Sequence, residues 1–326
     1  MIKHLEEWYL ENHRLLPFRE SHQPYHIWIS EIMLQQTQVE TVLPYYKNFI
    51  KVYPSIEDLA NTSEEALFKV IEGLGYYRRF KFMLKAAKKI VNEHKGVFPS
   101  TYKEVLALPG VGEYTAGAIM SIAYNKPFSA TDGNVIRVLS RIKDIKLDMR
   151  LEKNKNKIKS LNQSLIEDAQ PEIYTQAIME LGALVCKPKN PKCDECPLSK
   201  FCMAYELGTQ EQRPYLSKKA KKKIIHYNVY IIKYNSQIYL RKRTEKLLGG
   251  MYEFPQFEAN KQLDFKFEII KTLGHKKHVF THLVWEMDVY EIKLLSKALD
   301  DWQGIDMDQL NQYPMATAHK KIANLL

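Results

Sequence analysis

The chain has 326 residues, of which 45% are apolar, enough to build more than one folded core. Lysine and arginine total 48 against 38 acidic residues, and the net charge of +10 favours a polyanionic partner (DNA, RNA or an anionic membrane), unless it is only solvated surface. No run approaches the roughly 18 apolar residues that span a bilayer, and no targeting segment is evident, so we expect a cytoplasmic protein.

The first part of the chain predicts an all-α domain over residues 1–207, because apolar residues recur there at helical spacing. Between Ile27 and Val39 the only charged residue is Glu31, in an otherwise apolar and amide-bearing helix. Burial disfavours the charged form of a carboxyl and raises its pKa, as a general acid near neutral pH requires. The alternative is a glutamate on the wet face of the helix.

Two predicted helices, Thr101–Leu108 and Tyr114–Ala123, are joined by the sequence Pro-Gly-Val-Gly. This is a helix-hairpin-helix pattern. Gly110 and Gly112 permit close approach of the backbone, and N–H groups at the start of the second helix can point at a DNA phosphate. A Pro-Gly turn also occurs in ordinary helical bundles.

Asp132 precedes a predicted helix whose apolar residues share one face. Asp132 is either an N-cap or a functional carboxylate. In the functional interpretation it stabilises the positive charge of an oxocarbenium-like transition state while a second carboxyl, Glu31, protonates the leaving group.

All four cysteines of the chain lie within seventeen residues, at Cys186, Cys193, Cys196 and Cys202. Disulfides are the alternative to a metal site, but they belong mainly to small secreted domains. Four thiolates can hold zinc or a [4Fe–4S] cluster, and a Cys-x2-Cys pair does not choose between the two.

The sequence pattern changes after residue 207. Residues 208–223 form a basic stretch without a core pattern, which predicts a linker. Strands are predicted at Ile224–Tyr234 and Gln237–Arg243, flanking a turn at residues 235–236. With a helical segment at Leu263–Leu273 and a strand at His278–Leu294, we predict a smaller α+β domain over residues 224–326.

Together these motifs resemble the adenine DNA glycosylases of the MutY family over nearly the whole chain. The resemblance rests on Leu16–Arg19, Ser30–Thr37, Gly73–Tyr77, Leu108–Tyr114, Asp132–Val135 and Glu180–Cys186. The complete cysteine spacing is similar to the cluster loop of this family and of endonuclease III, which implies a [4Fe–4S] cluster at residues 186–202. Phe18 stands where many relatives have tryptophan, a smaller stacking surface.

The resemblance implies removal of adenine mispaired with 8-oxoguanine or guanine from double-stranded DNA, in base excision repair. Glu31 then protonates adenine at N7, Asp132 stabilises the oxocarbenium ion, and Tyr114 and Asn134 support them. The same resemblance implies contacts with adenine or DNA for Arg19, Leu34 and Gln176 in the base pocket, Gln36 and Tyr76 as a duplex wedge, and Gly110, Val111 and Gly112 at the hairpin.

The C-terminal domain resembles a Nudix domain, with Gly249–Pro255 similar to a Nudix loop. The segment Leu263–Leu273 has too few carboxylates to hold catalytic metal ions, so we expect a lesion sensor instead of a pyrophosphohydrolase. Phe280, Thr281 and His282 resemble the Phe-Ser-His loop of relatives and are expected to recognise 8-oxoguanine. Alternatively, they only begin a strand.

Two rival functions are less compatible with these residues. Endonuclease III, which cleaves the strand through a lysine Schiff base, has lysine where this chain has Tyr114, so we expect a monofunctional enzyme. A non-catalytic iron–sulfur or electron-transfer protein would not need Glu31 together with a hairpin motif. We expect a monomer associated with the bacterial nucleoid, in which the cluster orders a DNA-binding loop.

Overall fold

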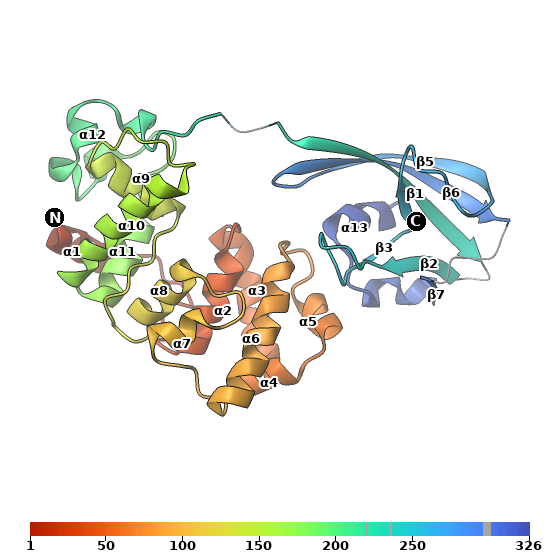
Figure 1. The fold of residues 1–326 in the computed structure, drawn as a ribbon, viewed down its shortest axis with the longest axis horizontal. Coiled ribbons are helices and arrows are strands. Elements are labelled where there is room, and N and C mark those ends of the chain that lie inside the picture. The colour runs from red at the N-terminus through yellow and green to blue at the C-terminus, as the bar shows by residue number, and fades with distance from the viewer. Residues whose placement is uncertain (219–220, 235–236, 296–300) are drawn as a thin grey trace. The chain divides into compact units, whose positions relative to one another are not determined.

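The computed structural model describes residues 1–218, 221–234, 237–295 and 301–326. The chain begins with helices and continues into a β-sheet (Figure 1). The α-helices are α1 Ile2–Asn12, α2 Pro24–Leu34, α3 Val39–Val52, α4 Ile56–Asn61, α5 Glu64–Val70, α6 Arg78–His94, α7 Tyr102–Leu106, α8 Glu113–Ile122, α9 Gly133–Ile142, α10 Glu152–Glu167, α11 Pro171–Leu184, α12 Met203–Glu206 and α13 Thr317–Ala323. Among the described residues, no helix is both long and apolar enough to cross a membrane.

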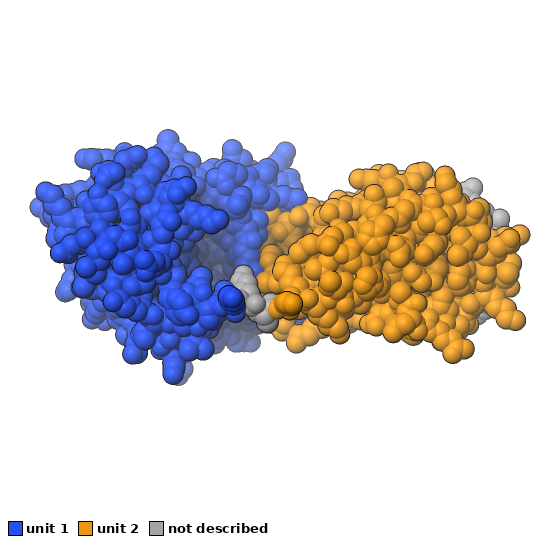
Figure 2. Space-filling view, turned by 90° about the horizontal axis from the view of Figure 1, so that it is seen from above, with its two compact units in different colours: residues 1–60, 85–218 blue, residues 61–84, 219–326 orange. Residues whose placement is uncertain are grey.

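The chain forms two compact units, which Figure 2 colours separately. Unit 1 comprises residues 1–60 and 85–218, and unit 2 comprises residues 61–84 and 219–326. Unit 2 therefore combines the C-terminal sheet with a segment from the helical part of the sequence. The predicted linker at 208–223 includes residues 219–220, which lie outside the described part of the chain.

Unit 1 is helical because apolar side chains recur on buried helix faces, as in α9, where Val135, Val138, Leu139 and Ile142 are buried. The helix expected across Ile27–Val39 is two helices. α2 ends at Leu34, and Gln36 has a φ of 58°, a left-handed conformation that a helix cannot continue through. The turn presents Gln36 to solvent.

Unit 2 contains a mixed sheet in the order β3-β2-β1-β6-β5, with β4 pairing β1 and β7 pairing β2. The strands are β1 Lys223–Tyr234, β2 Gln237–Lys242, β3 Tyr252–Glu253, β4 Gln256–Glu258, β5 Phe267–Val279, β6 Leu283–Leu294 and β7 Trp302–Asp306. β1 runs parallel to β6 and antiparallel to β2. The predicted pairing of the first two strands is confirmed, while the turn at residues 235–236 lies outside the described part.

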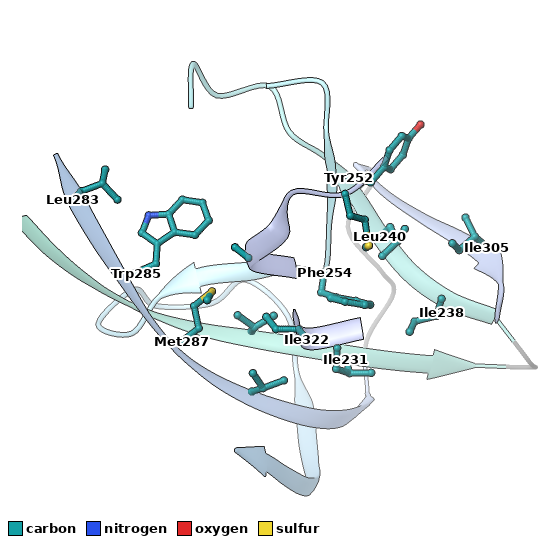
Figure 3. Packing of buried hydrophobic residues seen from close by; sticks show 14 residues of the cluster. Ile231, Ile238, Leu240, Tyr252, Phe254, Leu283, Trp285, Met287, Ile305 and Ile322 are labelled. Atoms are coloured by element: carbon teal, nitrogen blue, oxygen red, sulfur yellow. The ribbon is translucent and has the colours of Figure 1, made fainter. Parts of the chain in front are cut away.

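Alternation along β1 sends side chains into two cores, one on each face of the sheet. Val229 and Ile231 pack in the core that includes Trp285 and Ile322, from β6 and α13 (Figure 3). Tyr230 and Ile232 pack in the second core, beside residues such as Phe265. An α+β domain following an all-α domain is the predicted fold class, and it is confirmed.

Two predictions for the C-terminal part are wrong. Leu263–Leu273 is not a helix, because residues from Phe267 onward form β5, which pairs with β6. The strand expected at His278–Leu294 is interrupted, since β5 ends at Val279 and β6 begins at Leu283. Phe280 to His282 therefore form the loop between two antiparallel strands and lie outside the paired part of the sheet.

Candidate active site and iron–sulfur loop

Glu31 is a buried carboxylate, 1% exposed, on the last turns of α2. Its Oε2 accepts a hydrogen bond of 2.6 Å from the hydroxyl of Tyr114. Its Oε1 lies 3.3 Å from Nη2 of Arg19 but accepts no hydrogen bond. Nη1 of Arg19 is likewise buried without a hydrogen-bond partner. A donor and an acceptor are thus left available side by side, as a polar ligand requires.

Tyr114 lies in the first turn of α8, immediately after the hairpin. The turn between α7 and α8 closes through a hydrogen bond from Val111 N to Leu108 O, and Gly110 adopts a φ of 78° that favours glycine. Gly112 is the N-cap residue of α8 and is exposed. Burial, followed by the charges of Glu31 and Asp132, raises the pKa of Tyr114 well above its ordinary value. Tyr114 is therefore a neutral hydrogen-bond donor to Glu31.

Asp132 is the N-cap of α9, since its Oδ1 accepts a 2.8 Å hydrogen bond from Val135 N. Its Oδ2 accepts a second bond, also of 2.8 Å, from Nδ2 of Asn134. Burial raises the pKa of Asp132, although these hydrogen bonds oppose the shift. The cap and the functional interpretation are compatible, because a carboxylate that accepts hydrogen bonds keeps its negative charge.

The other residues expected around the base differ in exposure. Gln176 is buried on α11, where its Oε1 accepts a 3.1 Å hydrogen bond from the hydroxyl of Tyr9. Leu34 is half-buried at the end of α2, close in sequence to Glu31, and Gln36 is exposed. A cleft of about 760 Å³ opens beside Tyr114, between the hairpin and α10. Glu31 and Asp132 do not line that cleft.

The four cysteines follow α11 and surround one small cavity. Among the described residues, no group of histidine, cysteine, aspartate or glutamate side chains is arranged to hold a single metal ion. Four thiols around a shared space can hold either a zinc ion or a [4Fe–4S] cluster. Burial, and to a lesser degree the charges of the other three cysteines, raise the pKa of Cys196 to about 12. Bound iron would lower the pKa of these thiols, because cysteine binds metal as the thiolate.

The loop between β5 and β6 belongs to unit 2. The ring of Phe280 packs edge to face on Trp285, with ring centroids 4.8 Å apart. The backbone carbonyl of Phe280 accepts a 2.7 Å hydrogen bond from Lys222 Nζ. Thr281 and His282 are exposed. The Thr281 hydroxyl lies 2.8 Å from that of Tyr76, a residue with a φ of 51°. The predicted wedge residue and lesion-contacting residue are therefore hydrogen-bonded neighbours.

Comparison with known proteins supplies the family. Sequence models match the chain for the HhH-GPD superfamily base excision DNA repair proteins at residues 29–167, for the iron–sulfur binding domain of endonuclease III at 186–202 and for the NUDIX domain at 228–325. An adenine DNA glycosylase of Buchnera aphidicola subsp. Baizongia pistaciae (strain Bp) is 38% identical over 83% of this chain and 79% of its own. The chain belongs to the adenine DNA glycosylase family.

A second relative supports this assignment, and a solved structure supports the fold. The adenine DNA glycosylase of Buchnera aphidicola subsp. Schizaphis graminum (strain Sg) is 36% identical over 85% of this chain and 84% of its own. The structure of a thermostable thymine-DNA glycosylase is 28% identical and superposes with a TM-score of 0.57 over 63% of this chain and 95% of that one. The predicted family, the DNA N-glycosylase class, the [4Fe–4S] cluster and the NUDIX-like domain are confirmed.

Sequence reasoning missed Arg137, which connects the candidate active site with the cysteine loop of this glycosylase. Arg137 on α9 donates from Nη2 to Asn134 Oδ1 at 2.7 Å, and from Nε to the carbonyl of Cys186 at 2.7 Å. A chain of hydrogen bonds thus runs from Asp132 through Asn134 and Arg137 to the first cluster ligand. The feature of the sequence that could have revealed this connection is the spacing of Arg137 and Arg141, which lie four residues apart in a helix with a buried apolar face.

Proposed function

We propose that the protein removes adenine from double-stranded DNA where adenine is mispaired with 8-oxoguanine or with guanine. The observation that carries the proposal is the buried Glu31 carboxyl, held on one oxygen by Tyr114 and left without a hydrogen-bond donor on the other. Membership of the adenine DNA glycosylase family supports the choice of base. We expect the enzyme to act as a monomer in base excision repair, on the nucleoid in the bacterial cytoplasm.

The proposed reaction begins when adenine leaves the duplex stack and enters the site beside Glu31. Glu31 donates a proton from Oε1 to N7 of adenine, which lets the base leave with the electron pair of the N-glycosidic bond. Asp132 faces the sugar and stabilises the positive charge that develops there. Water then forms a bond to C1′ and returns a proton to Glu31, so that the products are adenine and an abasic strand.

Supporting residues hold these two carboxyl groups in place. The Tyr114 hydroxyl fixes the orientation of Glu31, and Asn134 fixes that of Asp132. We assign Arg19, Leu34 and Gln176 to the adenine pocket, with the unpaired Nη1 of Arg19 as a donor to the base. Gly110, Val111 and Gly112 present the start of α8 to a DNA phosphate. Gln36 and Tyr76 are each assigned to wedging the duplex beside the lesion.

We also propose that the NUDIX-like domain recognises the lesion and hydrolyses nothing. The segment that supplies glutamates in a Nudix catalytic helix is replaced here by a strand, β5. Recognition is assigned to Phe280, Thr281 and His282. The [4Fe–4S] cluster is held by the four cysteines and keeps their loop ordered for contact with DNA; no step of base release passes through it.

The test is base release from a duplex with adenine opposite 8-oxoguanine. We expect free adenine and a strand that breaks only after treatment with alkali, because Tyr114 cannot form an imine. Borohydride should therefore trap no covalent complex. Strand cleavage without alkali, together with a trapped complex, would instead identify a bifunctional lyase. Absence of adenine release from either mispair would contradict the proposal.

A further inference from the structure

Arg141 is a buried cation that base release does not use. It lies on α9, is 2% exposed and lines the cavity that the four cysteines surround. Removing a guanidinium from water is costly unless hydrogen bonds and negative charge compensate it. Within the described ranges no carboxylate lies at ion-pair distance from Arg141. The neighbouring carboxylate, Asp144, pairs with Arg213 at 2.8 Å.

The donors of Arg141 are directed at both ends of the cysteine loop. Nη1 donates to the Sγ of Cys186 at 3.2 Å and to the carbonyl of Lys187 at 2.7 Å. Nε donates to the carbonyls of Gln210 and Arg213, at 2.7 and 3.1 Å. Carbonyls satisfy its hydrogen-bonding capacity but leave its charge unmatched. The remaining source of negative charge is the set of four cysteine thiolates.

We propose that Arg141 sets the reduction potential of the iron–sulfur cluster. A buried positive charge stabilises the more negative, reduced state of a cluster, and an N–H···S hydrogen bond draws electron density from the ligand sulfur. Both effects raise the potential and make the loaded cluster harder to oxidise. Arg141 is a positioning residue, because it acts through Cys186 and not on the substrate.

The test compares cluster potentials in the full-length holoprotein, purified anaerobically and free of DNA. Arg141→Gln removes the charge, whereas Arg141→Lys keeps the charge and removes the planar fork. We expect Arg141→Gln to lower the midpoint potential enough to change the ratio of oxidised to reduced cluster at least tenfold, which corresponds to about 59 mV for one electron. Arg141→Lys should shift the potential in the same direction by a smaller amount.

The matched control is Lys200→Met, which removes an exposed cation two residues before Cys202. Solvent screens that charge, so the potential should stay near the wild-type value. Iron content is measured for every variant. A fully loaded Arg141→Gln protein with the wild-type potential would overturn the proposal. If Arg141→Gln does not retain iron, Arg141→Lys provides the test. An unchanged potential in the iron-loaded Arg141→Lys protein would equally contradict the proposal.

Discussion

Glu31 is the residue on which the proposed base release depends most directly. An amide fills the space of the carboxyl but cannot supply a proton, so Glu31→Gln should slow adenine release by about 10²–10⁴-fold. DNA affinity should stay close to that of the wild type. Single-turnover release and a binding titration on the same duplex measure the two quantities. The control is Glu11→Gln, an exposed glutamate of α1. Near-normal release by Glu31→Gln would remove Glu31 from the mechanism.

Asp132 caps α9 and has a second, proposed role in base release, and different substitutions separate the two. Asparagine is as good an N-cap as aspartate, so Asp132→Asn should keep the thermal stability but slow base release by about 100-fold or more, because the charge facing the sugar is lost. Asp132→Ala should lose both the charge and the cap, and with the cap about 0.5–2 kcal/mol of unfolding free energy. Full activity in Asp132→Asn would leave Asp132 as a helix cap and nothing more.

At the residue scale, the sequence was informative where one residue type stood out from its surroundings. Glu31 is the only charge in an apolar helix, and its burial follows from that setting. Its partner Tyr114 is 83 positions away. No local pattern predicts that such distant side chains meet, because the contact depends on how α2 and α8 pack. The resemblance to a family supplied that pairing, and the structure supplied its geometry.

At the element scale, the approach of α11 to α9 positions Asn134. A Cβ on Gly182 would lie 2.6 Å from the Cβ of Asn134. Gly182→Ala should therefore push Asn134 away from Asp132, slow base release and cost about 1–3 kcal/mol of unfolding free energy. Gly133→Ala is the control, because its Cβ meets nothing within 4 Å. Its melting temperature should be unchanged or higher. Equal melting temperatures for the two variants would contradict this account of the helix contact.

The element that sequence reasoning assigned wrongly is β5. Its pairing with β6 shifts register between Ile269 and Lys271 and again between Thr272 and Gly274. Each shift moves the following side chains to the other face of the sheet, which obscures the two-residue alternation expected of a strand. β1 lacks such irregularities in its pairing with β6, and its strand was predicted nearly to the residue.

At the scale of the whole molecule, lesion recognition and base release are assigned to separate units. Thr281→Ala combined with His282→Ala should raise the activation free energy of adenine removal opposite 8-oxoguanine by about 1–3 kcal/mol, because hydrogen bonds to the lesion are lost. Removal opposite guanine should change much less. Thr272→Ala, an exposed threonine of β5 in the same unit, serves as the control. Equal losses on both duplexes would place lesion recognition elsewhere.

The membership of residues 61–84 in unit 2 affects how the protein can be divided. Glu65 accepts a hydrogen bond of 3.1 Å from the Tyr252 hydroxyl, and Glu72 accepts one of 2.9 Å from Met315 N and pairs with Lys320 at 2.9 Å. A recombinant fragment that stops at residue 218 would keep both glutamates and lose all of these partners. The shortened enzyme would differ from the whole one in the environment of α5 as well as in the loss of the NUDIX-like domain. His282→Ala is therefore the cleaner way to test the proposed lesion sensing apart from catalysis, because it leaves the contacts of Glu65 and Glu72 and the hydrogen bond between Thr281 and Tyr76 intact.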